Sequence, residues 1–335
     1  MAIQISKKMK IIFVLFAGVI FAGFSYVYQK ILGGKALNLP ENEYIVGDKN
    51  VVTVTPQKEE QVVASIVYSD NIARGIDEVI QKTGNLNFIL PGQKVLIKPN
   101  VNSDDPAPGT THPEALAEVV RLAKARGAYV IVGDRSNPNW KTIPAMKTTG
   151  MYSAAQEAGA DEIVGFEDEE WIRVSPEKAK FWPNGFRIPK RLQEVDHIIS
   201  VPVLHTHSIT GHSLAIKNLV GLIDPIDRMV FHASKNREEM IAEISLAIKP
   251  SLVVIDGTRA LIRGGPSKGE IAETKVYLAS KDVLAGDVLG VTLLEKHGAS
   301  LPFKNPWDSG QIKHFLGLSL SQFSEDEINK EVSKI

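Results

Sequence analysis

Short runs of consecutive apolar residues alternate along this chain with segments in which apolar residues recur every three or four positions. The first pattern is typical of buried strands, and the second of helices that pack against a sheet. Their alternation favours an α/β fold, in which a mostly parallel sheet carries helices on both faces. The runs predict strands at 62–67, 94–98, 129–132, 162–164, 197–204, 252–255 and 275–278, and the spacing predicts helices at 72–83, 113–126, 149–157, 237–248 and 282–296.

Two local signals refine this pattern. The residues Thr111-His112-Pro113-Glu114 form a capping-box motif that predicts a helix start at Pro113, and Gly127 marks the end of that helix. Between 166 and 188 the helical pattern gives way to two short β-like segments, which predict a small β-hairpin insertion. Such a hairpin is either a lid over the site or an ordinary sheet edge.

The N-terminus predicts a membrane segment. Lysines at positions 7, 8 and 10 precede an uncharged, mostly apolar run from Ile11 to Val27, which is long enough to insert into a bilayer as a helix. We interpret 11–28 as an uncleaved, single-pass anchor in the cell membrane, because the run lacks a good Ala-x-Ala-like cleavage site. The basic flank places the main domain on the extracytoplasmic side. A cleaved signal peptide, and therefore a secreted protein, is the alternative.

The composition excludes several classes of function. The 335 residues carry 38 basic and 39 acidic side chains, so no excess of positive charge is available to hold a nucleic-acid backbone. The absence of cysteine excludes disulfides, thiolate nucleophiles and iron–sulfur clusters bound by the chain's own thiolates. The predicted segments are a cytoplasmic N-terminus at 1–10, the transmembrane anchor at 11–28, a linker at 29–60, an α/β domain at 61–300 and a C-terminal tail at 301–335.

Three histidines follow the apolar run 197–204 closely. If the strand continues through His207, then His205 and His207 share one face at the carboxyl edge of the sheet, where ligands collect in α/β folds. With His212 or His232 they form a candidate site for nickel or zinc. Proton transfer by these histidines is a second interpretation. Hydrogen bonds from each histidine to the backbone or to water are the structural alternative.

Lys217 lies four residues beyond Ser213, so both side chains face the same side of a short helical segment. A partly buried lysine in this position acts as a nucleophile or as a clamp for an anion. A surface lysine with its ammonium in water is the alternative. Ser213 and Asn218 are candidates for binding the substrate.

A second group of polar side chains follows the predicted strand 94–98. Lys98, Asn100 and Asn102 offer an amine and two amides at the carboxyl end of that strand, so they are candidates for binding an acid. Turns use asparagine for their own hydrogen bonds, which gives these residues an equally simple structural interpretation.

Three further residues are weaker candidates. Asp134 and Asp256 each end an apolar run, so each is either a base or ligand-orienting carboxylate or a helix cap. His112 belongs to the capping box and is a candidate substrate-binding residue, with exposure to solvent as the alternative. The glycine-rich segment 264–269 lacks the spacing of a P-loop and predicts a loop near the site.

Together these motifs resemble the family catalogued as domain of unknown function 362, over roughly residues 61–298. Many relatives in that family carry a ferredoxin-like cysteine segment, which this chain lacks, and they usually have lysine where this chain has His205. The resemblance implies the fold and no settled activity. It rests on Lys98-Pro99-Asn100-Val101-Asn102, Pro113-Glu114, Gly133-Asp134, Val201-Pro202-Val203-Leu204, Leu214-Ala215-Ile216-Lys217-Asn218-Leu219, Asp256-Gly257 and Gly265-Pro266.

A more distant similarity is to nickel-dependent lactate racemases. The spacing His207-x3-Gly211-x-Ser213-x3-Lys217 is similar to their segment in which a catalytic histidine precedes, by ten positions, the lysine that tethers a nickel-pincer nucleotide. The resemblance implies a metal-binding role for His232, and Thr111-His112-Pro113 resembles their Thr-Arg-Pro segment. This chain has histidine in place of that arginine, and Gly133-Asp134 where a second catalytic histidine is expected.

These features predict a membrane-anchored, outward-facing α/β enzyme. We expect His207 to act as general acid and base and Lys217 as an anion clamp or tether, with His205, His212 and His232 as ligands of a divalent metal. The reaction is then metal-assisted proton transfer, of isomerase or racemase type, on a small oxyacid or other anion. The alternatives are a non-catalytic module that binds a metal or an anion at the membrane surface, and a scaffold whose histidines bind nothing.

Overall fold

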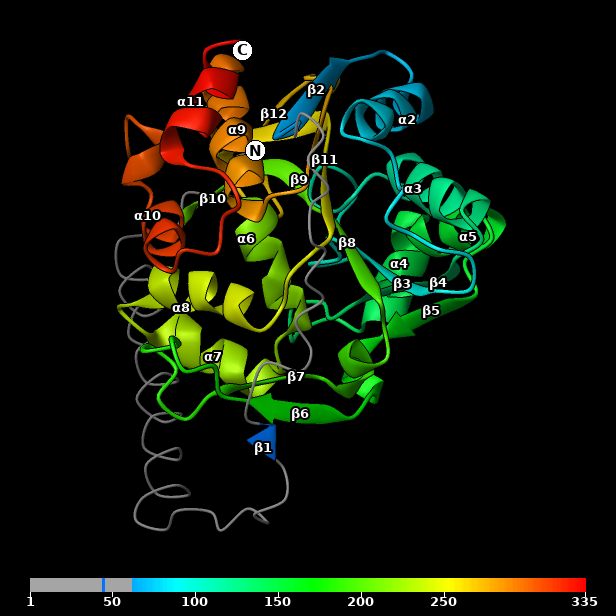
Figure 1. Cartoon of the computed structure of the whole chain (residues 1–335), viewed down its shortest axis with the longest axis horizontal. Coiled ribbons are helices and arrows are strands. Elements are labelled where there is room, and N and C mark those ends of the chain that lie inside the picture. Colours follow the sequence, from blue (N-terminus) through cyan, green and yellow to red (C-terminus); the bar gives the residue numbers. More distant parts are fainter. Residues whose placement is uncertain (1–43, 46–61) are drawn as a thin grey trace, which may run out of the picture. The chain divides into compact units, whose positions relative to one another are not determined.

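The computed structural model describes residues 44–45 and 62–335. The strands of its main sheet are β2 (Ala64–Tyr68), β3 (Lys94–Pro99), β4 (Tyr129–Asp134), β5 (Glu162–Gly165), β8 (His197–Val201), β9 (Val203–His207), β10 (Gly211–Ser213), β11 (Leu252–Gly264), β12 (Gly269–Ala272) and β13 (Val276–Ser280). The central path runs β10-β9-β11-β8-β3-β4-β5, and every neighbouring pair from β9 to β5 is parallel. Strands β10, β12, β13 and β2 add antiparallel edges. The predicted α/β fold with a mostly parallel sheet is therefore confirmed (Figure 1).

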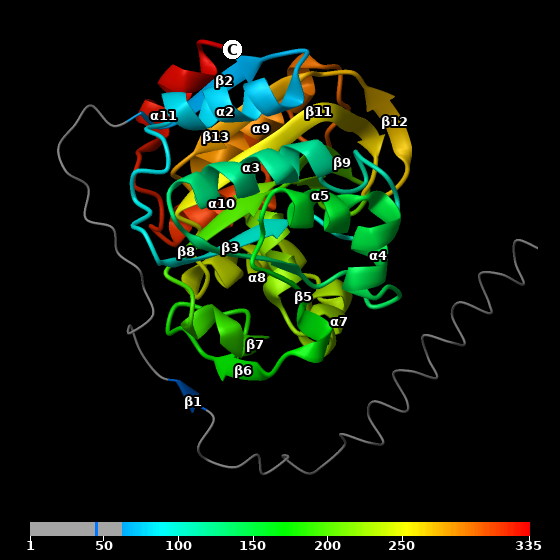
Figure 2. The ribbon, with the colours of Figure 1, turned by 90° about the vertical axis from the view of Figure 1, so that its right-hand side faces the viewer.

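Helices cover both faces of this sheet, because strand residues alternate between two apolar cores. In β3, Val95 and Ile97 pack into one cluster of buried side chains and Leu96 packs into the other. The first cluster lies under α2 (Ile72–Lys82), α3 (Pro113–Ala125) and α5 (Met151–Glu157). The second lies under α6 (Ala215–Asn218), α8 (Arg237–Glu243), α9 (Val283–Lys296), α10 (Gly310–Gly317) and α11 (Glu325–Val332). Figure 1 shows the two layers on opposite sides of the strands, and in Figure 2 the first layer faces the viewer.

The predicted hairpin insertion is also present. Strands β6 (Trp171–Val174) and β7 (Phe186–Pro189) pair antiparallel, and β1 (Tyr44–Ile45) joins β6 in parallel. These strands form a separate small sheet at one end of the domain, beside α7 (Pro225–Ala233) (Figures 1 and 2). The hairpin therefore belongs to a separate small sheet and does not continue the main sheet.

Several element boundaries differ from those predicted. The helix expected at 149–157 is α5, which begins at Met151, and an unpredicted helix, α4 (Thr142–Thr149), precedes it. Gly150, with a left-handed φ of 82°, ends α4 and separates the two. Strand β11 continues well past 255, where it pairs with β12 and β13. Helix α7 was not predicted, although the Asp224 side chain caps it by accepting from the Ile226 N–H and Pro225 opens it.

The capping box gave the correct start of α3 but the wrong capping residue. His112 is the N-cap, and its Nδ1 accepts a hydrogen bond from the Glu114 N–H at 3.2 Å. The Thr111 hydroxyl instead donates to the Val201 carbonyl at 2.8 Å and accepts from the Asn100 N–H at 2.8 Å. Thr111 therefore joins the ends of β3 and β8, and the neighbouring histidine supplies the cap.

The predicted anchor at 11–28 lies outside the described residues, as does the linker except for β1. Within residues 44–45 and 62–335, no helix is long and apolar enough to cross a membrane.

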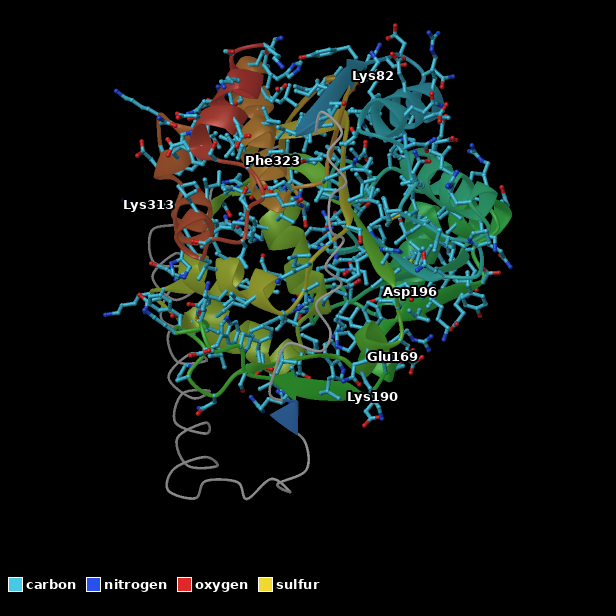
Figure 3. All side chains as sticks on the ribbon, viewed as in Figure 1. Lys82, Glu169, Lys190, Asp196, Lys313 and Phe323 are labelled. Carbon is cyan, nitrogen blue, oxygen red and sulfur yellow. The ribbon has the colours of Figure 1, made fainter. Side chains whose placement is uncertain are left out.

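The C-terminal segment packs on the second apolar core. Ile312 and Phe315 of α10, Ile328 of α11 and Phe323 between the two helices are buried in the same cluster as the apolar side chains of α8 and α9. Phe323 lies in the segment that connects α10 to α11 (Figure 3). The folded domain therefore extends through residues 301–335.

Replacement of Ile328 by alanine tests this contribution. Ile328 is fully buried, so Ile328→Ala should lower the free energy of unfolding by about 2–5 kcal/mol through lost apolar contact and a residual cavity. The exposed neighbour Lys330 is the control, and Lys330→Ala should change stability by less than about 0.5 kcal/mol. Urea unfolding measures both. Equal effects of the two substitutions contradict a structural role for the segment.

Candidate functional site

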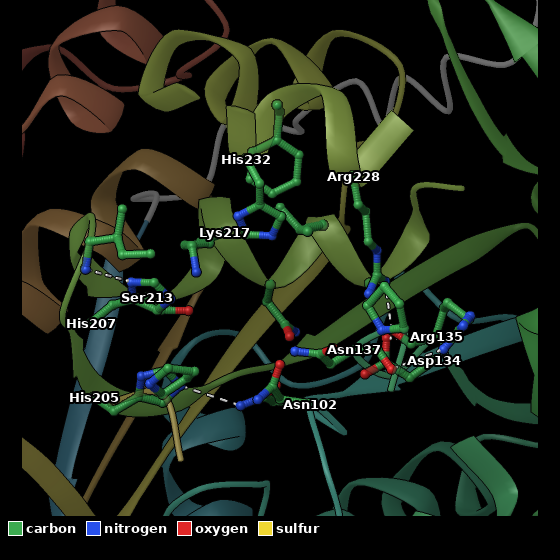
Figure 4. Close-up of a pocket in the computed structure, with 18 of the residues that line it drawn as sticks. Asn102, Asp134, Arg135, Asn137, His205, His207, Ser213, Lys217, Arg228 and His232 are labelled. Carbon is green, nitrogen blue, oxygen red and sulfur yellow. Dashed lines mark hydrogen bonds between the residues drawn. The ribbon is translucent and has the colours of Figure 1, made fainter. Parts of the chain in front are cut away.

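The ends of several parallel strands surround a pocket of about 240 Å³. Strands β3, β4 and β9 contribute to it from the sheet, and α6 and α7 contribute from the opposite wall (Figure 4). This is the edge at which ligands bind in open α/β sheets. The structure brings together ten of the predicted site residues around this pocket: Lys98, Asn100, Asn102, Asp134, His205, His207, Ser213, Lys217, Asn218 and His232.

His205 and His207 lie on the same face of β9, as the extended strand predicted, and both line the pocket. The His205 Nδ1 lies 3.0 Å from the Thr206 carbonyl, which accepts only from a protonated nitrogen. Burial lowers the pKa of His205 to about 4, so the ring is neutral at pH 7 and its Nε2 carries a lone pair. The Asn100 amide donates to that Nε2 at 3.3 Å.

His207 has the opposite tautomer. Its Nδ1 accepts from the backbone N–H groups of Ile209 at 3.1 Å and Thr210 at 3.3 Å, so this nitrogen carries no proton. Burial, together with the positive charge of Lys217, lowers the pKa of His207 to about 2, and the ring stays neutral. The proton is therefore on Nε2, and the ring acts as a hydrogen-bond donor.

His212 does not line the pocket. It follows Gly211 in β10, where it pairs with Thr206, so alternation along the strand turns its side chain to the other face of the sheet. There it is fully buried, with Nε2 3.3 Å from the Asp287 carboxylate. Asp287 also accepts from the Ile216 N–H at 3.0 Å, which fixes the start of α6. His212 thus lies beneath the helix that carries Lys217.

His232 reaches the pocket from the last turn of α7, and its ring packs on Phe231 at 4.1 Å between centroids. Partial burial lowers its pKa, and the charges of Lys217 and Arg228 lower it further. Within residues 44–45 and 62–335, no three histidine or carboxylate side chains are placed to hold one metal ion. A divalent metal at His205 and His232 stays a prediction, whereas His212 lies on the opposite face of the sheet and outside the pocket.

Lys217 extends from α6 into the pocket, on the same side as Ser213 (Figure 4). Burial lowers the pKa of Lys217 to about 7, and the positive charge of Arg228 acts in the same direction. In the part of the chain that the structure describes, no hydrogen bond or ion pair engages its amine. Lys217 is therefore available to a ligand and changes its charge near neutral pH.

A buried ion pair lies at the base of the pocket. The Lys98 ammonium contacts the Asp134 carboxylate at 2.8 Å, and both side chains are almost fully buried. The same ammonium donates to the Asn218 amide oxygen at 3.1 Å, and the Asn218 amide group donates to the Ser200 hydroxyl at 2.9 Å. Burial lowers the pKa of Lys98, and the Asp134 charge opposes that shift. Asp134 therefore neutralises a lysine and caps no helix.

Two arginines of the site were not predicted. Arg135 directly follows Asp134, and its guanidinium donates to the Ser136 carbonyl at 2.7 Å. Arg228 of α7 donates to the carbonyls of Ser136 at 2.8 Å and Arg135 at 2.5 Å, and burial lowers its pKa to about 10. The Arg135 guanidinium also lies 3.9 Å from the buried Glu167 carboxylate, whereas the carbonyl partners of Arg228 leave its positive charge in place. The sequence signal for Arg228 was the Asp224-Pro225 helix start between Lys217 and His232.

The remaining candidates lie away from the pocket. His112 caps α3, and its backbone N–H donates to the Asp256 carboxylate at 2.7 Å. The other oxygen of Asp256 accepts from the Thr258 hydroxyl at 2.7 Å, so Asp256 orders the backbone at a helix start. Pro266 of the predicted glycine-rich loop does line the pocket. No residue of the hairpin region 166–189 does so, which favours the sheet-edge interpretation over a lid.

Comparison with known proteins agrees with this fold. The domain of unknown function DUF362 matches residues 95–292, which is more than half of the chain. The chain belongs to the DUF362 family. The resemblance noted in the sequence is thereby confirmed. A thylakoid-associated protein from Synechocystis sp. is 29% identical over 224 residues, which cover 64% of this chain and 67% of that protein.

The DUF362 match contains the complete pocket. The lining residues extend in sequence from Lys98 to Pro266, and all of them lie inside 95–292. The anchor predicted at 11–28 and the two C-terminal helices lie outside the matched range. The range that matches the family model therefore includes every residue that lines the pocket.

The Lys98–Asp134 pair should dominate the stability of this DUF362 protein's pocket. Lys98→Met leaves the Asp134 charge buried without a partner and should lower the free energy of unfolding by about 3–5 kcal/mol. The double substitution Lys98→Met/Asp134→Asn removes that charge and should recover part of the loss. Lys94→Met, which breaks an exposed 3.9 Å pair on the same strand, is the control and should cost less than about 1 kcal/mol. A double variant no more stable than Lys98→Met contradicts this account.

Proposed function

We propose that the pocket binds a small organic oxyacid and transfers a proton on it. The observation that supports this most is the balance of charge around the cavity. Four cationic side chains line it, and Asp134 is the single carboxylate among the residues described there. Asp134 offsets one lysine, so the field that remains attracts an anion. The cavity volume of about 240 Å³ suits a small molecule.

The tautomers and pKa values divide the roles between two side chains. His207 presents a fixed Nε2–H donor, which suits it to hold an anionic oxygen rather than to remove a proton. Lys217, with a pKa of about 7, is present both as amine and as ammonium at neutral pH, which is the condition for a general acid and base. Lys217 therefore exchanges a proton with the substrate while His207 and Arg228 hold the acid group.

Two alternatives are kept because specific residues favour them. His205, whose Nε2 carries a lone pair, and His232 both line the pocket, which favours a metal-assisted form of the reaction with nickel or zinc. A non-catalytic module that only captures an anion uses the same cations and needs no proton transfer. Lys98, Asn100, Asn102, Ser213 and Asn218 bind the ligand's polar groups in either case.

The protein is further proposed to act at a membrane. The Synechocystis relative is named as thylakoid-associated, and the uncharged run from Ile11 to Val27 follows three lysines. We place the chain in the cell membrane through a single N-terminal span, with the α/β domain on the extracytoplasmic side. Secretion after signal cleavage is the competing arrangement, and N-terminal sequencing of the native protein distinguishes them.

The charge of Lys217 predicts how anion binding depends on pH. Below pH 7 the ammonium attracts the anion, and above pH 7 the neutral amine does not, so affinity should fall roughly tenfold or more between pH 6 and pH 8.5. Titration calorimetry with lactate and with sulfate measures this, because neither probe changes charge in that range. Lys217→Arg should bind evenly across the range, and Lys217→Met should bind weakly throughout. A pH dependence that survives in Lys217→Met contradicts the assignment.

Proton transfer itself is tested by solvent exchange. Full-length protein in D₂O should introduce deuterium at C2 of at least one 2-hydroxy acid, or at C3 of at least one 2-oxo acid, in a panel read by mass spectrometry. Lys217→Met should abolish exchange, whereas His207→Gln, which keeps a donor, should retain anion binding. Anion binding without exchange supports the non-catalytic module. Stoichiometric nickel or zinc that is lost in His205→Ala/His232→Ala supports the metal-assisted form.

A further inference from the structure

Helix α7 buries charged side chains and exposes apolar ones, which is the reverse of an ordinary surface helix. Asp227 and Arg228 are buried, at 7% and 5% exposure, whereas Ile226, Met229 and Val230 are 55%, 50% and 41% exposed. The three apolar residues are spaced i, i+3 and i+4, so they form one stripe along the helix. A large apolar stripe that faces outward marks a surface that contacts something other than water.

The inward charges are fully partnered, so the orientation of α7 is fixed. Arg187 of β7 contacts Asp224 at 2.7 Å and Asp227 at 3.1 Å, and its backbone N–H donates to Asp227 at 2.8 Å. Arg228 is held by the backbone carbonyls beneath it. Rotation of the helix to bury the stripe would break all of these contacts. The outward surface of α7 is therefore a stable feature of the fold.

The same end of the domain is where the chain leads towards its N-terminus. Strand β1, at Tyr44–Ile45, pairs with β6, and β6 pairs with β7, which holds α7 through Arg187 (Figures 1 and 2). Sixteen residues, 28–43, separate the apolar run from β1. Fully extended, they reach at most roughly 55 Å. A membrane that contains the run thus lies within reach of α7.

We propose that the outer face of α7 docks on the surface of the lipid bilayer, with Ile226, Met229 and Val230 in the interfacial region. This inference rests on the proposed membrane anchor and adds a second, independent contact. Apolar side chains of a surface helix bind the boundary between headgroups and acyl chains in this way. The inner side of α7 supplies Arg228, Phe231 and His232 to the pocket. Docking therefore places the cationic pocket at the membrane surface, beside anions that the membrane carries or concentrates.

The absence of cysteine in this chain makes the contact directly measurable. A fluorescent label is placed on Met229→Cys or, as the matched control, on Ser153→Cys, an exposed position on α5. Full-length protein is reconstituted in vesicles of phosphatidylcholine and phosphatidylglycerol. At position 229, nitroxide-labelled lipid should quench the label and aqueous iodide should lose access to it, whereas position 153 should show the reverse. Adding Ile226→Ser/Val230→Ser should restore iodide access at 229.

Each other outcome overturns the proposal. Equal iodide access at positions 229 and 153 would show that the outer face of α7 is exposed to water. Loss of iodide access without lipid quenching, increasing with protein density, assigns the face to a second copy of the chain. Flotation of the same vesicles reports the anchor separately, because anchored protein floats whether or not α7 touches lipid. Calorimetry with lactate reports the pocket, so failure of the docking face is distinguishable from failure of the proposed anchor or of anion binding.

Discussion

The pocket depends on the buried ion pair between Lys98 and Asp134. Parallel strands β3 and β4 end at this point, and the pair joins their ends at 2.8 Å. The Asp134 carboxylate also accepts from the backbone N–H groups of Val101 and Arg135 at 2.7 and 2.8 Å, which sets the direction of both loops. A Cβ at Gly221 would collide with Asp134 and Lys98, so the chain after α6 passes directly over the pair. A buried pair of this kind is a weak source of net stability but a strict requirement for position.

Because Asp134 is occupied by Lys98, the other cations of the site have no carboxylate to neutralise them within the pocket. Arg228 is held by carbonyl oxygens, which orient a guanidinium without cancelling its charge, whereas Arg135 also lies 3.9 Å from the buried Glu167 carboxylate. Burial, together with the field of Arg228, lowers the pKa of Lys217 and of His232. The same field opposes a bare divalent cation and favours a ligand that brings negative charge. The chemistry of the site is thus set by charges that the fold leaves uncompensated.

The sequence predicted the site's position well because parallel strands share a carboxyl edge. Lys98, Asp134 and His207 are far apart in the chain, yet each follows a buried apolar run, and they meet in one pocket. Arg228 could not be found in this way, since α7 buries its charged residues and exposes its apolar ones, which reverses the pattern that sequence reading assumes. His212 seemed close by numbering, but the pairing of β10 with β9 turns it to the opposite face.

The spacing of His205 and His207 in the sequence does not specify their chemical roles, because backbone groups determine the tautomer of each ring. A metal ligand that binds through Nε2 needs its proton on Nδ1, which is the tautomer that the Thr206 carbonyl imposes on His205. The turn after β9 directs two N–H groups at Nδ1 of His207 and imposes the other tautomer. Two imidazoles on one strand face are therefore chemically unequal, one an acceptor and one a donor. Neither histidine changes its charge near neutral pH. The pocket side chain that does so is Lys217, whose amine has no partner among the described residues.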